Sequence, residues 1–243
     1  MDVDLINVDK IIKNHKIINN ISLSIKSGEV VGLIGPNGAG KTTLMKMICG
    51  LSSISNGKIL FNGERLNKYH NKDKFPVGAL IENPAAYSNL SGIKNVEISA
   101  RAKGIKKEEL KDIFDSLIYE SGLGSNIYKK VKTYSLGMKQ RLGIAMSMIG
   151  NPQILLLDEP INGLDPDGIQ YIRELIPRLS NDNITVIVSS HILSELNIVC
   201  SKFFFVKKGE IIGSMLKEEL SQLNVDKVYK KMMSNEVENG KFV

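Results

Sequence analysis

A glycine-rich segment near the N-terminus has the composition of a phosphate-binding loop. The string GPNGAGKTT fits the pattern GxxxxGK[ST] and lies between a strand-like apolar stretch and a helix-like one. Glycines let consecutive backbone N–H groups turn inward around phosphate oxygens, and the N-terminus of a following helix adds a favourable dipole. The lysine supplies an ammonium for the β and γ phosphates, and the hydroxyl after it ligates Mg²⁺. We therefore expect a nucleotide to be bound by Gly35, Pro36, Asn37, Gly38, Ala39, Gly40, Lys41, Thr42 and Thr43. The alternative, a glycine-rich turn without a ligand, is disfavoured by the strand–loop–helix context.

Two consecutive carboxylates, Asp158 and Glu159, follow the continuous apolar run ILLL. Such a run is typical of a strand buried in a parallel sheet. An aspartate at this strand end can hold the Mg²⁺ shell, and a carboxylate beside it can orient or deprotonate an attacking water. We expect Thr42 and Asp158 to bind the metal, and Glu159 and Lys41 to be catalytic. For the acidic pair by itself, a solvated strand end is the alternative.

His191 ends a second apolar run, ITVIVSS. Parallel strands bring their carboxyl ends to one crevice, which is where open α/β sheets bind ligands. We expect this strand to lie beside the Asp158 strand and His191 to contact the γ phosphate. A structural role is the usual alternative for a lone histidine.

A second anion site is predicted at the start of a helix, in the string KTYSLGMKQRLGIAM. Ser135 and Gly137 offer a hydroxyl and a free N–H group at a helix N-terminus, which favours a phosphate. An ordinary N-cap is the alternative for Ser135.

The elements around these residues alternate between strands and helices, which predicts the α/β class. We expect strands at 2–8, 17–25 and 30–34, the first two as a hairpin, and further hairpins around 58–61 and Lys208-Gly209. Amphipathic patterns predict helices between 92 and 122, and we expect Pro177 to bend or end a later helix.

Composition narrows the class of protein less than the motifs do. The 243 residues carry a net charge of +6, with 42% hydrophobic and 24% charged residues, as in ordinary globular proteins. The basic excess suits a nucleotide, a nucleic acid or an anionic membrane face alike. Cys49 and Cys200 stand alone, which favours a reducing compartment. No apolar run reaches the roughly 20 residues that span a bilayer, and the acidic N-terminus is unlike a signal peptide.

These motifs, in this order, resemble those of the ATP-binding subunit of an ABC transporter. The matching strings are GPNGAGKTT (Walker A), YSLGMKQR (signature loop), ILLLDEP (Walker B with its glutamate), NGLDP (D-loop) and SSH (H-loop). The resemblance runs from Val3 to Ser214. It implies a P-loop NTPase (RecA-like) core with an N-terminal antiparallel β subdomain and a helical subdomain at about 88–150. The expected domain limits are 1–216 for the ATPase domain and 217–243 for a charged C-terminal tail.

The resemblance also implies partners. Two subunits would pair head to tail, a homodimer, so that Ser135, Gly137 and the D-loop residue Asp165 act on nucleotide held by the other subunit. ATP and Mg²⁺ would be the cofactors, and a membrane-spanning permease the further partner, with no nucleic acid. The expected location is the cytoplasmic face of the cell membrane, reached through the permease.

The chain departs from the family pattern at three places. Ile12 stands where an aromatic residue usually stacks on adenine, and the signature loop carries Leu136 and Met138 in place of a glycine and a glutamine. Glu82 stands at the position of the Q-loop glutamine. A glutamate there resembles the bacterial ATPases that serve bacitracin and lantibiotic self-immunity exporters. The resemblance thus implies an ATPase driving export of a peptide antibiotic, for self-immunity or resistance.

Other interpretations remain open from the sequence. One is the ATPase subunit of another ABC transporter, including an importer. Another is a soluble ABC ATPase, although the chain has no sustained heptads between Lys41 and Ser135 and carries one ATPase domain. A nucleotide switch that does not hydrolyse ATP is disfavoured by the intact Lys41, Asp158, Glu159 and His191.

Overall fold

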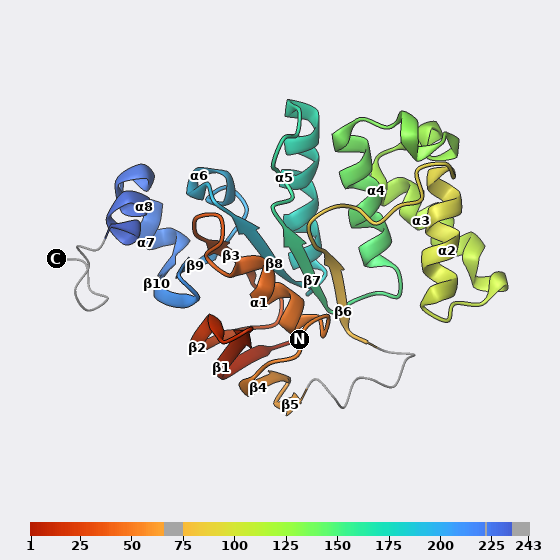
Figure 1. Cartoon of the computed structure of the whole chain (residues 1–243). Coiled ribbons are helices and arrows are strands. Elements are labelled where there is room, and N and C mark those ends of the chain that lie inside the picture. The colour runs from red at the N-terminus through yellow and green to blue at the C-terminus, as the bar shows by residue number, and fades with distance from the viewer. Residues whose placement is uncertain (66–74, 222, 235–243) are drawn as a thin grey trace.

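A six-stranded sheet forms the centre of the molecule (Figure 1). The structure is a computed structural model, and it describes residues 1–65, 75–221 and 223–234. In spatial order the strands are β10 (Glu210–Leu216), β9 (Lys202–Lys207), β3 (Val30–Ile34), β8 (Thr185–Ser190), β7 (Ile154–Asp158) and β6 (Val77–Leu80). Neighbours are parallel except β10 and β9, the predicted hairpin. Strands β3, β7 and β8 are buried along their whole length, as unbroken apolar runs predict. The α/β class is confirmed.

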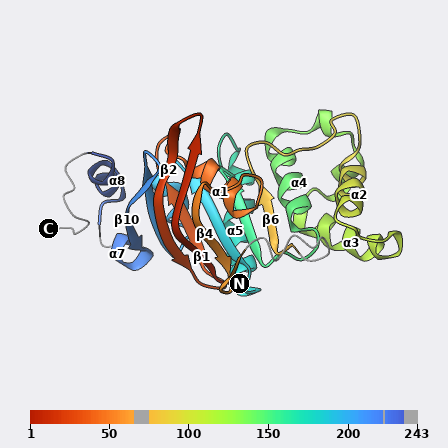
Figure 2. The same ribbon diagram turned by 60° about the horizontal axis from the view of Figure 1, so that its bottom comes forward.

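A second, antiparallel sheet covers one face of the first (Figure 2). Its order is β2 (His15–Ile25), β1 (Val3–Ile12), β4 (Asn56–Phe61) and β5 (Glu64–Arg65), so both predicted N-terminal hairpins are confirmed. Helix α1 (Lys41–Ile48) packs its apolar residues into the core that the two sheets share. Because α1 begins at the glycine-rich loop, this packing fixes the loop against both sheets.

Helix α5 (Pro166–Asn181) packs on the opposite face of the central sheet and runs through Pro177 without ending there. Of the two outcomes expected for Pro177, an end to the helix is therefore wrong, and a bend stays a prediction. An internal proline costs a helix about 3 kcal/mol, because it removes one N–H donor and crowds the preceding turn. Ile172 and Ile176 precede it and Leu179 follows it, all three buried in the core. Burying each such side chain contributes about 1.5–3 kcal/mol, which offsets that cost.

A separate helical subdomain has its own apolar core, apart from the sheets. It comprises α2 (Gly92–Ala102), α3 (Leu110–Ser121) and α4 (Leu136–Met148), with short 3₁₀ turns η2 (Lys107–Glu109), η3 (Gly124–Tyr128) and η4 (Val131–Thr133). Figure 1 places these helices beyond the β6 edge of the sheet. The helices expected between 92 and 122 are confirmed.

The described part of the C-terminal segment is folded onto the core. Helices α7 (Lys217–Ser221) and α8 (Val225–Met233) follow β10, and α8 lies beside α6 (Leu193–Leu196), the helix after His191. Val228 and Met232 are buried with the residues of α5 and the central sheet. Lys207 Nζ donates a hydrogen bond of 2.6 Å to the carbonyl of Met233, at the C-terminal end of α8. The charged segment from 217, expected to be a tail, therefore packs on the central core as far as it is described.

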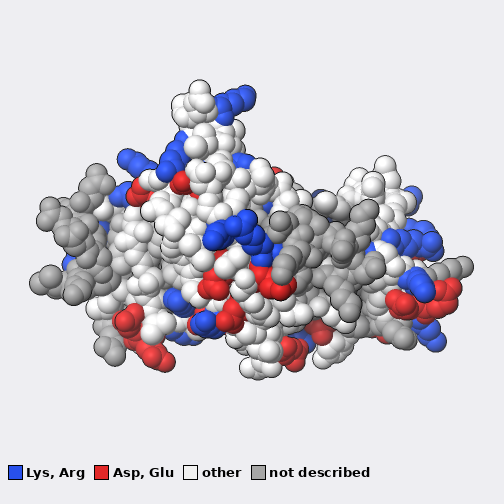
Figure 3. Space-filling view, turned by 90° about the horizontal axis from the view of Figure 1, so that it is seen from below, with Lys and Arg blue, Asp and Glu red and all other residues white. Residues whose placement is uncertain are grey.

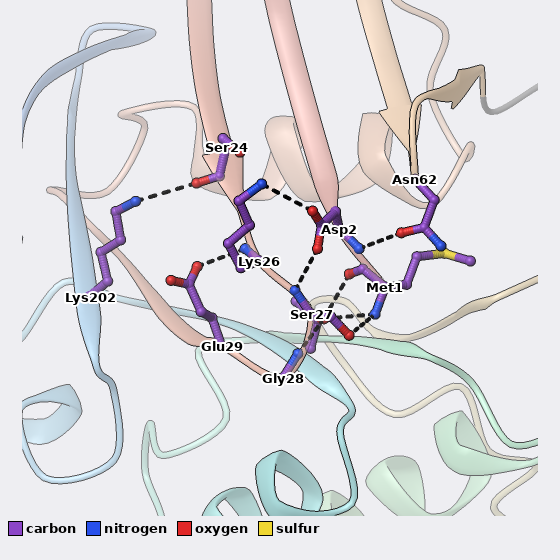
Figure 4. A network of polar contacts seen from close by, with 10 residues as sticks. Met1, Asp2, Ser24, Lys26, Ser27, Gly28, Glu29, Asn62 and Lys202 are labelled. Carbon is purple, nitrogen blue, oxygen red and sulfur yellow. Dashed lines mark hydrogen bonds and ion pairs between the residues drawn. The ribbon is translucent and has the colours of Figure 1, made fainter.

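A polar network around the first residues of the chain and the turn before β3 joins the two sheets (Figure 4). Asp2 accepts hydrogen bonds from the Ser27 N–H at 2.8 Å and from Lys26 Nζ at 3.1 Å. These donors, the backbone N–H first, hold the pKa of Asp2 below its usual range.

Seen from below, acidic and basic side chains lie in neighbouring groups rather than in one basic patch (Figure 3). No helix among the described residues is both long and apolar enough to cross a membrane.

Candidate functional site

The glycine-rich loop connects β3, in the middle of the central sheet, to α1. Gly35 is required at its start, because a Cβ atom there would lie 2.1 Å from the carbonyl oxygen of Val206. Gly40, just before α1, has φ of 108°, a left-handed conformation that favours glycine. Pro36, Asn37 and Gly38 are exposed at the crest of the loop. The loop is therefore fixed at both ends and open at its crest.

Lys41 is buried at the base of this loop, with 5% of its surface exposed. Its Nζ donates to the carbonyls of Gly35 at 2.6 Å and Pro36 at 3.2 Å. Nζ also lies 3.4 Å from Oε1 of Glu159. The ammonium thus joins the loop to the acidic strand end.

Asp158 accepts hydrogen bonds on both carboxylate oxygens. Thr42 donates to Oδ2 at 2.8 Å and Ser189 donates to Oδ1 at 2.5 Å. Asp158 is 3% exposed and lies opposite Ser189 in the β7–β8 register. The strand neighbourhood predicted for Asp158 and His191 is thereby confirmed. Ser189 was not predicted as a site residue. It lies on β8, the strand that ends before His191, and its position two residues before that histidine is the signal that would have found it.

Glu159 bridges Lys41 and His191. Its Oε1 faces Lys41 Nζ, and its Oε2 lies 2.8 Å from Nδ1 of His191. Its backbone has φ of 50°, a left-handed conformation that costs a residue with a Cβ atom about 1 kcal/mol or more. The Glu159 N–H donates to Ser189 Oγ at 2.9 Å, which holds this turn in place. The structure therefore brings together Lys41, Thr42, Asp158, Glu159 and His191, as the sequence predicts.

Glu82 follows β6 and lies outside this cluster. Its Oε1 is 2.7 Å from Nζ of Lys46, on α1, and its φ is 63°. Lys46 was not predicted as a site residue, because nothing in the sequence pairs it with residue 82.

Ser135, Gly137 and Asp165 form a second group. Ser135 Oγ accepts from the Met138 N–H at 3.2 Å, so the serine does serve as an N-cap. Asp165 caps α5 by accepting from the Gly168 N–H at 2.9 Å, and a Cβ atom on Gly137 would lie 3.4 Å from Asp165 Oδ1. Among the described residues, no hydrogen bond or ion pair connects this group to the cluster around Glu159.

Ile12 is the last residue of β1, opposite His15, and is 45% exposed. Its expected role beside adenine stays a prediction.

Comparison with known proteins gives matches along most of the chain. The sequence model of the family described as "ABC transporter" matches residues 18–162, and one described as "AAA domain, putative AbiEii toxin, Type IV TA system" matches 129–197. The uncharacterized ABC transporter ATP-binding protein YhcH of Bacillus subtilis is 44% identical over 212 residues, 86% of this chain and 68% of YhcH. The lantibiotic transport ATP-binding protein SrtF of Streptococcus pyogenes is 41% identical over 206 residues, 85% of this chain and 87% of SrtF. The bacitracin transport ATP-binding protein BcrA of Bacillus licheniformis is 37% identical over 216 residues, 88% of this chain and 70% of BcrA.

Solved structures give the same fold. CbiO1 from Clostridium perfringens, part of the ABC transporter complex cbiONQ, has a TM-score of 0.81 and 26% identity, covering 95% of this chain and 94% of its own. The ATP-binding cassette MJ0796, in a dimeric post-hydrolysis state bound to ADP and Pi, has a TM-score of 0.79 and 26% identity, covering 88% of this chain and 98% of its own.

Proposed function

The chain belongs to the ABC transporter family as an ATP-binding, ATP-hydrolysing subunit, and on this premise we propose that it powers export of a peptide antibiotic. The observation that carries the substrate class is the 41% identity to a lantibiotic transport protein over 87% of that protein's length. The 37% identity to a bacitracin transport protein supports the same class. The cargo is then a lantibiotic or a bacitracin-type peptide, exported for self-immunity or resistance.

We assign the hydrolytic roles from the cluster around Glu159. Glu159 lies beside both a cation and an imidazole, so its carboxylate is placed to orient the attacking water and accept its proton. Lys41 balances negative charge on the transferred phosphoryl group, and His191 donates a hydrogen bond to it. The loop from Gly35 to Thr43 binds the phosphates through its backbone N–H groups.

A Mg²⁺ ion fits the donor set of Thr42 and Asp158. Both supply hard oxygen ligands, and Mg²⁺ is commonly bound by one or two protein oxygens together with substrate phosphates and water. No cluster of three or more acidic, histidine or cysteine ligands occurs among the described residues, which is in keeping with such a shared site. When bound, the ion supplies charge neutralisation at the β and γ phosphates.

The second group, Ser135 and Gly137 beside Asp165, supports a head-to-tail homodimer. These residues offer anion-binding groups at a helix N-terminus, yet they make no contact with the phosphate-loop cluster in the described parts of their own chain. We therefore assign them to nucleotide on the Walker A loop of a second subunit. The dimer works with a membrane-spanning permease and is held at the cytoplasmic face through it.

Drug sensitivity of the source bacterium tests the substrate class. Deleting the gene should lower the minimal inhibitory concentration of a lantibiotic or of bacitracin, and the wild-type gene should restore it. A gene carrying Glu159→Gln should not restore it, which ties resistance to hydrolysis. Unchanged sensitivity to both peptide classes after deletion would overturn the export proposal while leaving the ATPase assignment intact.

A further inference from the structure

Helix α1 carries two lysines, and each contacts a carboxylate from a different strand end. Lys41 lies 3.4 Å from Glu159, after β7, and Lys46 lies 2.7 Å from Glu82, after β6. The first pair belongs to the hydrolytic cluster described above. The second pair joins α1 to the loop that carries glutamate where the family usually has glutamine.

Lys46, which pairs with Glu82, lies one helical turn along α1 from the proposed metal ligand Thr42. Thr42 and Lys46 are four residues apart on α1, so they lie on the same face, about 6 Å apart along the helix axis. Thr42 contacts Asp158, while Glu82 is turned to the ammonium one turn further along the helix. The Glu82 carboxylate is therefore paired with a lysine one helical turn from Thr42.

The Lys46–Glu82 contact is weak enough to exchange. The Glu82 side chain is 62% exposed and that of Lys46 is 36% exposed, so solvent screens their attraction. Glu82 also has a left-handed backbone, which an L-residue adopts at a cost. A neutral glutamine at this place would need no counter-charge, whereas a glutamate beside bound polyphosphate does.

We propose that Lys46 is a positioning residue that sequesters the Glu82 carboxylate and releases it to the metal when MgATP binds. The inference rests on the proposed Mg²⁺ site at Thr42 and Asp158. Pairing with Lys46 keeps Glu82 from repelling incoming ATP, and exchange of Lys46 for the metal uses the same carboxylate as an additional oxygen ligand. Lys46 thereby makes a glutamate at the Q-loop position compatible with ATP binding.

The test is equilibrium ATP binding by calorimetry, with excess Mg²⁺ and with a chelator. The quantity compared is the ratio of Kd for metal-free ATP to Kd for MgATP. It is measured for wild type, Lys46→Met, Glu82→Gln and the double variant. If Lys46 and Glu82 act on the ligand only through space from fixed positions, the effects of the two substitutions on this ratio are additive. The double-mutant cycle then gives an interaction free energy of zero.

We expect Lys46→Met to raise the ratio in the wild-type background, where Glu82 is present. The rise should be two- to fivefold larger there than in the Glu82→Gln background, because only a free glutamate can move to the metal. Raising the ionic strength should shrink this difference, since the exposed pair is screened. Lys94→Met is the matched control: Lys94 pairs with Glu97 at 2.6 Å on the helical subdomain, and its loss should leave the ratio unchanged.

Two results would overturn the proposal in different ways. Equal effects of Lys46→Met in both backgrounds, with a wild type whose ATP affinity depends on Mg²⁺, would exclude the Lys46 role alone. A wild type whose ATP affinity is the same with and without Mg²⁺ would overturn the metal assignment and the Lys46 role with it.

Discussion

At the residue scale, the centre of the site is a carboxylate that lies between a lysine and a histidine. Glu159 contacts both Lys41 and His191, and it lies on a turn fixed by Ser189. A carboxylate held between two donors has a defined orientation, which a general base requires.

Changing Glu159 to glutamine should remove proton acceptance while keeping size and hydrogen bonding. Because general-base catalysis contributes about 10²–10⁴-fold, we expect ATP hydrolysis to fall by at least about 100-fold. ATP affinity should change by less than about threefold, since the phosphate loop is intact. Phosphate release and ATP titration measure the two effects. Glu97→Gln, on the helical subdomain, is the control, and a Glu159→Gln protein that hydrolyses ATP at the wild-type rate would show that the base is another group.

Ser189→Ala should destabilise the protein. Its hydroxyl donates to buried Asp158 and accepts from the Glu159 N–H, so its loss leaves two polar groups without their partner. Leaving such groups unsatisfied costs about 1–3 kcal/mol of unfolding free energy. Urea denaturation measures this cost. Thr133→Ala, which removes an exposed hydroxyl bonded to one carbonyl, should cost less than about 1 kcal/mol, and equal losses in the two variants would argue against the Ser189 role.

The sequence predicts the residues of this site that stand in motifs, but it misses two of their contacts, Ser189 and Lys46. Lys41, Asp158 and Glu159 stand in motifs whose spacing along the chain carries the chemistry. Ser189 and Lys46 act through strand register and helix face, which bring them to residues 31 and 36 positions away. Such contacts are decided by tertiary packing rather than by local pattern.

At the scale of elements, the buried parallel strands were predictable and the C-terminal helix was not. Continuous apolar runs such as Ile154–Leu157 have few alternatives to a strand covered on both faces. Helix α8 has charged residues around a narrow apolar stripe that includes Val228 and Met232, and its stability comes from the core that receives this stripe.

Met232→Ala should therefore lower the free energy of unfolding by about 2–5 kcal/mol, as expected for a buried methionine. Leu223→Ala, at a residue that is 44% exposed, is the control and should cost well under 1 kcal/mol. Urea denaturation of the full chain measures both. Equal stability of the Met232→Ala protein and the wild type would show that α8 is not part of the cooperative core.

At the scale of the whole molecule, the two anion-binding groups do not meet within one chain. The phosphate loop lies at the centre of the sheet, and Ser135 caps α4 in the helical subdomain beyond the sheet edge (Figure 1). The sequence predicts both groups, and in the proposed dimer the second group binds phosphate held by the other chain. This separation within one chain is what supports the proposed head-to-tail pairing.

Ser135→Arg tests this dimer. In the Glu159→Gln background, ATP should produce a dimer by size-exclusion chromatography, and the added Arg side chain should prevent it, because its bulk obstructs close approach of a partner's phosphate to the helix N-terminus. Ser91→Arg is the matched control: Ser91 caps α2 in the same subdomain by accepting from the Lys94 N–H, so it loses a similar cap, worth about 1 kcal/mol. ATP binding to the monomer should survive in both variants, since Lys41 and the phosphate loop are untouched. A Ser135→Arg protein that dimerises with ATP as readily as the Ser91→Arg protein would place Ser135 outside the interface and leave its hydroxyl as a helix cap alone.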